Sequence, residues 1–365
     1  MGPALLWSDT RGSSAVSGRG LGTQRAGIGA KLAWLERHQA ARLARTRWAL
    51  GPRDLTAWRL CGEFVTDWTM ASAAGVLARL PPPVASTTVI GYLGRDPAGS
   101  LGLQAGIPVV IGAGDRQCEV VGSGASPTRP MVSWGTTANV SAPVDAEPWP
   151  EPADLLVTRS ATGGWLLEGG VSAAGSFLDW LGGLIGLGAA ALSTKAATSP
   201  PGARGVIATP WLGGARAPWW NDQAGAAFVG LSPAHDAGDL ARAAVEAVAW
   251  EIDRCLGEIG VGAGVAATGL AVSGGGKLWT DVLTGITGLP AWRRRSEETA
   301  SVGAALLAAT GVGEVWDLDR INPIVSSTAP DPSLTAAYGT LRPSAARAAE
   351  AVMGLAEGTA TFRRS

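Results

Sequence analysis

Two short segments of the chain carry the residues best suited to chemistry. In the first, an apolar run ending at Ile111 is followed by the glycine turn Gly112–Gly114 and then by a single acid, Asp115. In the second, the apolar run Met131–Trp134 is followed by Gly135-Thr136-Thr137. A carboxylate at a strand end can accept a proton from an attacking hydroxyl group. The N–H groups and hydroxyls of a Gly-Thr turn can face a phosphate, so the two segments together predict phosphoryl transfer.

A third glycine turn lies further along the chain. The apolar run Leu270–Ser273 predicts a buried strand, and Gly274-Gly275-Gly276-Lys277 follows it. Three glycines let a backbone approach a ligand closely and leave free N–H groups where a helix begins. The same triplet equally fits a tight turn between a strand and a helix. A dinucleotide-binding motif at Gly112 is excluded, because the position of its third glycine holds Gln117.

Two roles are open to Asp115. It can act as the general base of a transfer reaction, or it can cap the N-terminus of a helix predicted over 117–121. We favour the base, because this acid stands between two glycine turns.

Length and composition bound the class of protein. The 365 residues suffice for two domains with full cores, and 46% hydrophobic with 16% charged residues suits a folded protein. With a net charge of −1, the chain lacks the excess of positive charge that is typical of proteins that bind nucleic acid or an anionic membrane. The most apolar stretch, 178–192, is broken by glycine and aspartate and does not predict a membrane span. We therefore expect neither nucleic acid nor membrane as a partner.

Cysteine and histidine usage narrows the chemistry further. The three cysteines are far apart in the sequence and form no C-x-x-C motif, which suits a reducing compartment and predicts a cytoplasmic location. With only two histidines, His38 and His235, a histidine-based triad or metal site is not expected. No protein residues are assigned to a metal site.

Hydrophobic periodicity predicts the elements around these turns. A short buried strand is expected over 4–7, and a helix over 171–187 with Phe177, Trp180, Leu181 and Leu184 facing inward. The clearest helix begins at Asp236, with Asp239 in its first turn, and is expected to end at Gly257 and Gly260. The proline-rich stretch 127–130 predicts a domain boundary.

The order of these motifs resembles the FGGY carbohydrate kinases, the group that includes xylulose, glycerol and gluconate kinases. Members carry a Gly-Gly-Asp strand end, a Gly-Thr hairpin, a Gly-x-Arg-x-Pro loop and a Gly-Gly-Gly turn, in that order. In this chain the matching segments are the strand end at Asp115, Gly135–Thr137, Gly214–Pro218 and Gly274–Gly276. The segment 7–11 (Trp-Ser-Asp-Thr-Arg) is similar to a W-x-D-x-R segment in the family's first domain.

The resemblance implies a fold and a reaction. The fold would be α/β, with two actin-like (ribonuclease H-like) domains: an N-terminal domain over 1–126, incomplete at its N-terminus, and a C-terminal domain over 127–365. The reaction would transfer the γ-phosphoryl group of ATP, with Mg²⁺ bridging the phosphates, to a sugar or polyol hydroxyl. The implied roles are catalysis by Asp115, nucleotide binding by Gly135, Thr136, Thr137, Gly274, Gly275, Gly276 and Lys277, and substrate binding by Asp9, Arg11 and Asp115.

Three departures from the family pattern support an alternative. The family opens with a phosphate-binding D-x-G-T segment that this chain does not contain, so we expect either a fragment or mis-started reading frame, or a short protein that has lost half of its ATP site. The glutamate of the Gly-x-Arg-x-Pro loop is Ala215, and the spacing from the glycine triplet to Trp279 is shorter. These differences favour a non-catalytic nucleotide- or sugar-binding relic. The sequence names neither the sugar nor the oligomeric state, for which a homodimer is one option.

Overall fold

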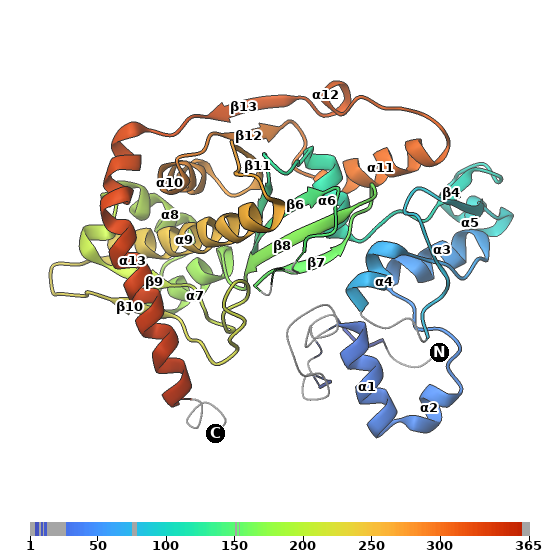
Figure 1. Ribbon diagram of the computed structural model, residues 1–365, viewed down its shortest axis with the longest axis horizontal. Helices are drawn as coiled ribbons and strands as arrows, with labels where there is room; N and C mark the ends of the chain where they lie inside the picture. Colours follow the sequence, from blue (N-terminus) through green and yellow to red (C-terminus); the bar gives the residue numbers. More distant parts are fainter. Residues whose placement is uncertain are drawn as a thin grey trace. The chain divides into compact units, whose positions relative to one another are not determined.

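The computed structural model shows two compact units, each with its own core. Unit 1 combines Met1–Gly124, Pro143–Leu166 and Glu298–Pro323, and unit 2 combines Ala125–Ala142, Leu167–Glu297 and Ile324–Ser365. Figure 1 labels the helices and strands of both. The structure describes residues 4–6, 9, 11–12, 27–74, 79–149, 152 and 154–359.

Unit 1 is mostly helical, with short strands. Its helices are α1 (Ile28–His38), α2 (Ala40–Ala44), α3 (Pro52–Cys61), α4 (Trp68–Ala74), α5 (Arg95–Leu101), α6 (Asp115–Ser123), α11 (Thr299–Gly311) and α12 (Leu318–Ile321). Its strands are β1 (Thr66–Asp67) paired with β2 (Pro83–Val84), β3 (Val89–Tyr92) paired with β4 (Pro108–Val110), and β7 (Leu156–Arg159).

Two glycines let α6 and α11 pack at very short range. A Cβ atom on Gly122 of α6 would lie 1.9 Å from the carbonyl oxygen of Thr299, and one on Gly303 of α11 would lie 1.9 Å from that of Cys118. No real Cβ fits at such distances, so both positions require glycine. The close contact fixes α6, whose first residue is Asp115.

The large sheet organises unit 2. Its strand order is β13-β12-β11-β5-β6-β8-β7. The strands are β5 (Met131–Trp134), β6 (Ala138–Val144), β8 (Trp165–Val171), β11 (Leu270–Gly274), β12 (Ala291–Arg294) and β13 (Ile324–Thr328), with β7 as above. Strands β5 and β11 run parallel, and β5 pairs with β6 in an antiparallel hairpin. Consequently β5 and β11 end at the same edge of the sheet.

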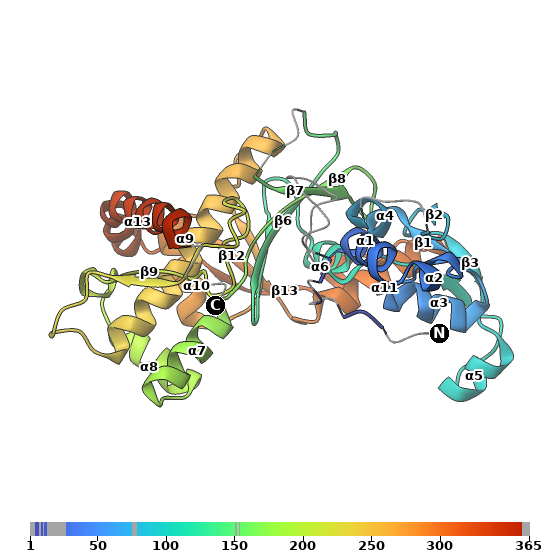
Figure 2. The same cartoon turned by 90° about the horizontal axis from the view of Figure 1, so that it is seen from below.

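The helices of unit 2 pack around this sheet and around a small second sheet. They are α7 (Gly175–Ile185), α8 (Ala189–Thr198), α9 (Ala237–Ala263), α10 (Lys277–Thr287) and α13 (Pro332–Thr359), with a 3₁₀ turn at Ala203–Gly205. The second sheet pairs β9 (Ile207–Thr209) with β10 (Ala227–Val229). Figure 1 and Figure 2 show that α13 crosses α9 at a steep angle on one side of unit 2.

Helix α9 confirms one prediction and corrects another. Asp236 caps it, accepting hydrogen bonds from the N–H groups of Gly238 and Asp239, as the sequence predicts. The predicted end at Gly257 and Gly260 is wrong, since the helix continues to Ala263 and is capped by Gly264. A glycine inside a helix costs only about 1 kcal/mol, and the buried face of α9 outweighs that cost.

Two other expectations are also wrong. Residues 4–6 form no strand and Leu6 is 67% exposed, while Trp7 lies outside the described residues. In α7, Phe177 and Leu181 are buried as predicted, but Trp180 and Leu184 are exposed. The buried face is rotated toward Gly182, where the backbone of Leu187 packs so closely that a Cβ atom would lie 2.3 Å from its carbonyl oxygen.

Within the described residues, no single helix is both long and apolar enough to cross a membrane. Helices α7 and α8 reach the required length and composition only as a pair, and they are bent by 98° at the break between them.

Candidate active site

The Gly-Thr turn and the glycine triplet lie side by side in unit 2. Gly274, the last residue of β11, pairs with Trp134, the last residue of β5. Gly274 has φ +68°, and a Cβ atom there would lie 2.0 Å from the carbonyl oxygen of Trp134. Only glycine satisfies both constraints. The carboxyl ends of adjacent parallel strands are where open α/β sheets bind ligands, so this edge is a candidate ligand site.

The Gly-Thr turn presents unused hydrogen-bond donors. The N–H of Gly135 donates to the carbonyl oxygen of Thr137 at 2.9 Å and closes the turn. The N–H groups and hydroxyls of Thr136 and Thr137 donate to no residue that the structure describes. Gly135 and Thr136 are exposed. Four donors are therefore available to an anionic ligand, whereas the N–H of Gly135 is not.

A third segment, the N-terminus of α7, completes the site, and the sequence analysis missed it. The N–H of Gly175 donates to the carbonyl oxygen of Gly135 at 2.9 Å, and the hydroxyl of Ser176 donates to that of Thr136 at 2.8 Å. A Cβ atom on Gly175 would lie 2.7 Å from the carbonyl oxygen of Gly135. The sequence offers a weak signal for it, a Gly-Ser pair that opens a helix after the apolar run 165–171.

The glycine triplet leads into the start of α10. Gly276 is its N-cap residue and contributes no side-chain hydrogen bond, so the first N–H groups of the helix face outward. Lys277 forms an ion pair with Asp281 one turn along, at 2.6 Å, and its side chain is 88% exposed. Arg293 of β12 donates to the carbonyl oxygen of Gly275 at 3.4 Å and to the hydroxyl of Thr280 at 2.9 Å, which restrains the turn.

These features fit a nucleoside polyphosphate. Free N–H and hydroxyl donors can bind phosphate oxygens, and the partial positive charge at the start of α10 favours an anion. Gly275 lies against Trp134 and Trp279, whose rings meet edge to face at 5.4 Å. Among the described residues, no three carboxylate, histidine or cysteine side chains gather in a way that could hold a metal ion. A Mg²⁺ ion at this site would rely on the phosphates and water, as Mg²⁺ commonly does.

In unit 1, Asp115 is the first residue of α6, and Gly114 is the N-cap. The alternative in which Asp115 caps a helix over 117–121 is therefore wrong, because the helix already includes Asp115. The side chain is exposed, and its Oδ1 accepts the N–H of Arg116 at 2.8 Å. Oδ2 accepts no hydrogen bond from a described residue, which leaves it able to take a proton.

A buried ionic cluster supports the loop that carries Asp115. Arg53 donates to the carbonyl oxygen of Gly112 at 3.2 Å and pairs with Asp54 and Asp67, each at 2.6 Å. Burial alone would lower the pKa of Arg53, but the charges of the two aspartates raise it, so the guanidinium stays charged. Asp67 is fully buried and also accepts the N–H groups of Thr69 and Met70 at the start of α4.

Asp9 and Arg11 form a pair with each other. The guanidinium of Arg11 donates to both carboxylate oxygens of Asp9 and lies 4.3 Å from the ring of Trp34. These hydrogen bonds lower the pKa of Asp9 to about 2. Within the described part of the chain, no hydrogen bond or ion pair joins Asp9 or Arg11 to Asp115.

The structure thus divides the residues that the sequence singles out. Gly135, Thr136, Thr137, Gly274, Gly275, Gly276 and Lys277 gather at one sheet edge of unit 2. Asp115, Asp9 and Arg11 belong to unit 1. Sequence spacing could identify the glycine turns. The Arg293 contact depends on a neighbouring strand, and no local pattern predicts it.

The known proteins to which this chain is similar are carbohydrate kinases. Residues 131–312 match the family model described as the FGGY family of carbohydrate kinases, C-terminal domain. A xylulose kinase from Klebsiella pneumoniae is 29% identical, over 93% of this chain and 78% of that protein. A glycerol kinase from Leptothrix cholodnii is 30% identical, over 88% of this chain and 74% of that protein.

A solved structure shows the same fold. The ligand-bound xylulose kinase from Lactobacillus acidophilus superposes with a TM-score of 0.87 at 22% identity, covering 95% of this chain and 79% of that one. The likeness confirms the α/β class with actin-like (ribonuclease H-like) domains that the motif order implies.

Proposed function

Because the chain belongs to the FGGY family of carbohydrate kinases, we propose that it transfers the γ-phosphoryl group of ATP to a hydroxyl group of a sugar or polyol. The observation that carries this proposal is the sheet edge of unit 2, where Thr136 and Thr137 offer free donors beside the glycine triplet. The similar proteins named xylulose kinase and glycerol kinase support a sugar or polyol as acceptor.

The nucleotide would bind through unit 2. Thr136 and Thr137 would donate to phosphate oxygens, with Gly135 shaping their turn. Gly274, Gly275 and Gly276 would let the nucleotide approach the backbone closely. Lys277 adds positive charge where α10 begins, although Asp281 shares that charge. Mg²⁺, carried with the phosphates, would neutralise their charge.

Asp115 would act as the general base. Its free Oδ2 would accept the proton of the acceptor hydroxyl as that oxygen forms a bond to the γ-phosphorus. The bond between the γ-phosphorus and the bridging oxygen breaks at the same time, and ADP leaves with that oxygen. Asp9 and Arg11 would contribute to the sugar side, where the half-exposed guanidinium of Arg11 can donate to hydroxyl groups.

Domain assignment follows the same proposal. We assign residues 127–365 to the C-terminal family domain and 1–126 to the part of the N-terminal domain that this sequence contains. The family match over 131–312 supports the first assignment.

The test is sugar-dependent ADP release from the purified chain. Mg-ATP would be combined with a panel of ketoses, aldoses and polyols, and each acceptor would be assayed with the wild type and with Asp115→Asn. Asp96→Asn is the matched control, because Asp96 is also an exposed aspartate in the first turn of a helix, α5. We expect ADP release in the presence of one class of acceptor. The rate of release should be at least about 100-fold lower in Asp115→Asn and unchanged in Asp96→Asn.

A second candidate function is nucleotide binding without transfer. Ala215 favours it, since it replaces the acid of the family loop and is buried in a cluster with Trp211 and Ala224. Binding of Mg-ATP without ADP release from any acceptor would support this candidate and contradict the kinase. Equal ADP release by wild type and Asp115→Asn would remove Asp115 from the mechanism.

A further inference from the structure

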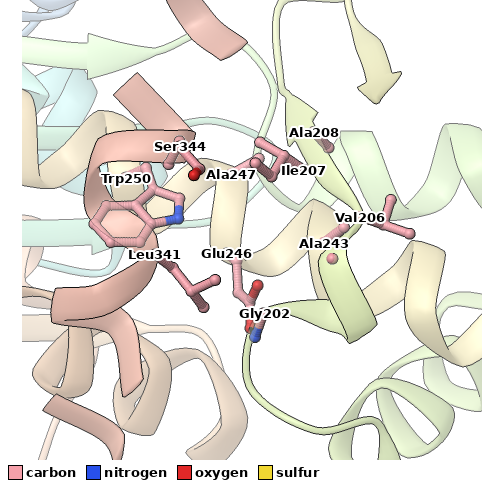
Figure 3. Close-up of a pocket in the computed structure, with 12 residues that line it drawn as sticks. Gly202, Val206, Ile207, Ala208, Ala243, Glu246, Ala247, Trp250, Leu341 and Ser344 are labelled. Carbon is pink, nitrogen blue, oxygen red and sulfur yellow. Dashed lines mark hydrogen bonds between the residues drawn. The ribbon is translucent and has the colours of Figure 1, made fainter. Parts of the chain in front are cut away.

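A separate cavity lies inside unit 2, between β9, α9 and α13. Its volume is about 260 Å³, and its walls are mostly apolar, with Val206, Ile207, Ala247 and Leu341 among them. Figure 3 shows these side chains around the space, with Trp250 and Ser344 at one side. Gly205, which also lines the cavity, is exposed, so the cavity opens to solvent there. None of the proposed nucleotide-binding residues lines it.

A buried carboxylate with one unused oxygen lines the cavity. Glu246 of α9 is 4% exposed. Its Oε1 accepts three hydrogen bonds, from Arg242 at 2.7 Å, Tyr338 at 2.8 Å and the N–H of Gly202 at 2.9 Å. Its Oε2 accepts none from any residue that the structure describes. Oε2 is not among the fully buried polar atoms that lack a partner, so it is open to the cavity, where a donor that enters can reach it.

Trp250 supplies an unused donor on the same wall. It stands one turn after Glu246 on α9, so the two side chains share a face of the helix. Its ring is held by Tyr338, edge to face at 6.0 Å, and by the guanidinium of Arg342 at 5.2 Å. Over the described ranges, the indole N–H donates to no residue. In Figure 3 its nitrogen lies on the side of the ring that faces Ala247 and Ile207.

The charge balance selects a neutral ligand. Arg242 and Glu246 form an ion pair with side chains only 7% and 5% exposed. Burial raises the pKa of Glu246, although the hydrogen bond and charge of Arg242 oppose that shift. The carboxylate is already matched by one guanidinium, so a cation would add an unbalanced charge. A carboxylate on the ligand would place a second negative charge beside that of Glu246, with no proton between the two groups.

We propose that this cavity is a binding site for a small neutral aromatic alcohol, whose hydroxyl group donates to Glu246 Oε2 and accepts from the indole N–H of Trp250. The ring would pack against Val206, Ile207 and Leu341. An apolar cavity of about 150 Å³ holds one benzene molecule, so the larger volume here suits about ten non-hydrogen atoms. The site is independent of the proposed kinase reaction.

The test is calorimetric titration of the full chain with three matched molecules. The phenol 4-ethylphenol carries the hydroxyl, ethylbenzene lacks it, and 4-ethylbenzoate replaces it with a charge. We expect 4-ethylphenol to bind about tenfold more tightly than ethylbenzene, as a hydrogen bond to a charged acceptor should provide. No binding of 4-ethylbenzoate is expected.

Variants locate the binding. Trp250→Phe keeps a ring but removes the N–H, and should weaken 4-ethylphenol binding about fivefold. Trp180→Phe is the control, since Trp180 is 40% exposed on α7 and does not line the cavity. Ala247→Leu should fill the cavity and abolish binding. If circular dichroism shows that it does not fold, Ala345→Val adds bulk from the α13 side instead.

Several outcomes would overturn the proposal. Folded wild-type protein that binds no 4-ethylphenol lacks the site. Equal affinity for 4-ethylphenol and ethylbenzene would mean that Glu246 and Trp250 form no hydrogen bond with the ligand, and that the cavity is only an apolar void. Full binding by the filled variants places the ligand elsewhere. Tight binding that Trp250→Phe weakens and Trp180→Phe leaves unchanged supports the assignment.

Discussion

Gly274 and Gly276 stand in the same glycine turn but meet different surroundings. Gly274 has a left-handed backbone, and a Cβ atom there would meet the carbonyl oxygen of Trp134 at 2.0 Å. Around Gly276, with φ −106°, nothing lies within 4 Å of the Cβ position. Gly274→Ala must therefore push β11 and β5 apart at the edge that we propose binds ATP.

We predict that Gly274→Ala weakens binding of Mg-ATP at least about tenfold and lowers the free energy of unfolding by about 1–3 kcal/mol. Gly276→Ala should leave the free energy of unfolding within about 0.5 kcal/mol of the wild type. Isothermal titration and urea denaturation measure the two effects. Unchanged nucleotide affinity in Gly274→Ala would separate this turn from the nucleotide site.

At the residue scale, the sequence identified those candidate residues whose role is indicated by the residues next to them in the chain. Asp115 follows a glycine turn, and the structure places it at the start of a helix with one oxygen unengaged. Ser176 and Arg293 escaped notice because their contacts join them to Thr136 and Gly275, far away in the sequence. Such contacts depend on strand pairing and on where a helix begins, so composition and spacing do not predict them.

At the scale of elements, the packing of α6 against α11 offers a direct test of how Asp115 is positioned. Gly303→Ala would place a methyl group against the backbone of Cys118, where only 1.9 Å is available. We predict that it lowers the free energy of unfolding by about 1–3 kcal/mol and reduces ADP release, because α6 must shift. Urea denaturation and the kinase assay would be run on the same preparation.

Gly339→Ala is the matched control for that variant. Gly339 is also inside a helix, α13, but nothing lies within 4 Å of its Cβ position. Alanine has the higher helix propensity, so this change should stabilise the protein by about 0.5–1 kcal/mol. Equal behaviour of the two variants would show that α6 and α11 are not in close contact.

The N-terminus of α9 makes stability depend on pH through Asp239. Burial would raise the pKa of this carboxyl, but hydrogen bonds from Ser199 at 2.7 Å and from the N–H of Asp236 at 3.1 Å lower it below its usual 3.8. A carboxylate with a lowered folded pKa stabilises the fold above the unfolded pKa. That stabilisation is lost as pH falls through the folded pKa.

Asp239→Asn should therefore lower the free energy of unfolding by about 1–3 kcal/mol at pH 6. The deficit relative to the wild type should shrink as the pH falls below about 3.8, because the carboxyl of the unfolded chain then binds a proton and the folded carboxyl, with its lowered pKa, follows at lower pH. Urea denaturation at pH 6 and at pH 3 measures both. The exposed Asp96→Asn should show no deficit at either pH, and a constant deficit for Asp239→Asn would contradict the linkage.

On the scale of the whole molecule, motif order predicted more than any single motif. Each glycine turn alone is a weak signal, yet their sequence order implied the fold that the solved xylulose kinase structure shares. The composition of the two compact units was less accessible. Segments 143–166 and 298–323 join unit 1 although they follow residues of unit 2, which reflects long-range contacts rather than local pattern.

Hydrogen exchange over the whole chain can test where the nucleotide binds. The N–H groups of Thr136 and Thr137 donate to no described residue, so their exchange should be fast in the free protein. With Mg²⁺ and a non-hydrolysable ATP analogue, we predict slower exchange in peptides covering 134–138 and 274–278, because phosphate oxygens would accept these protons. Peptides covering α5 in unit 1 should not change. Mass spectrometry gives each peptide its own rate, and Gly274→Ala should abolish the protection in both segments at the same analogue concentration. Protection confined to unit 1 would place the nucleotide away from the sheet edge where β5 and β11 end.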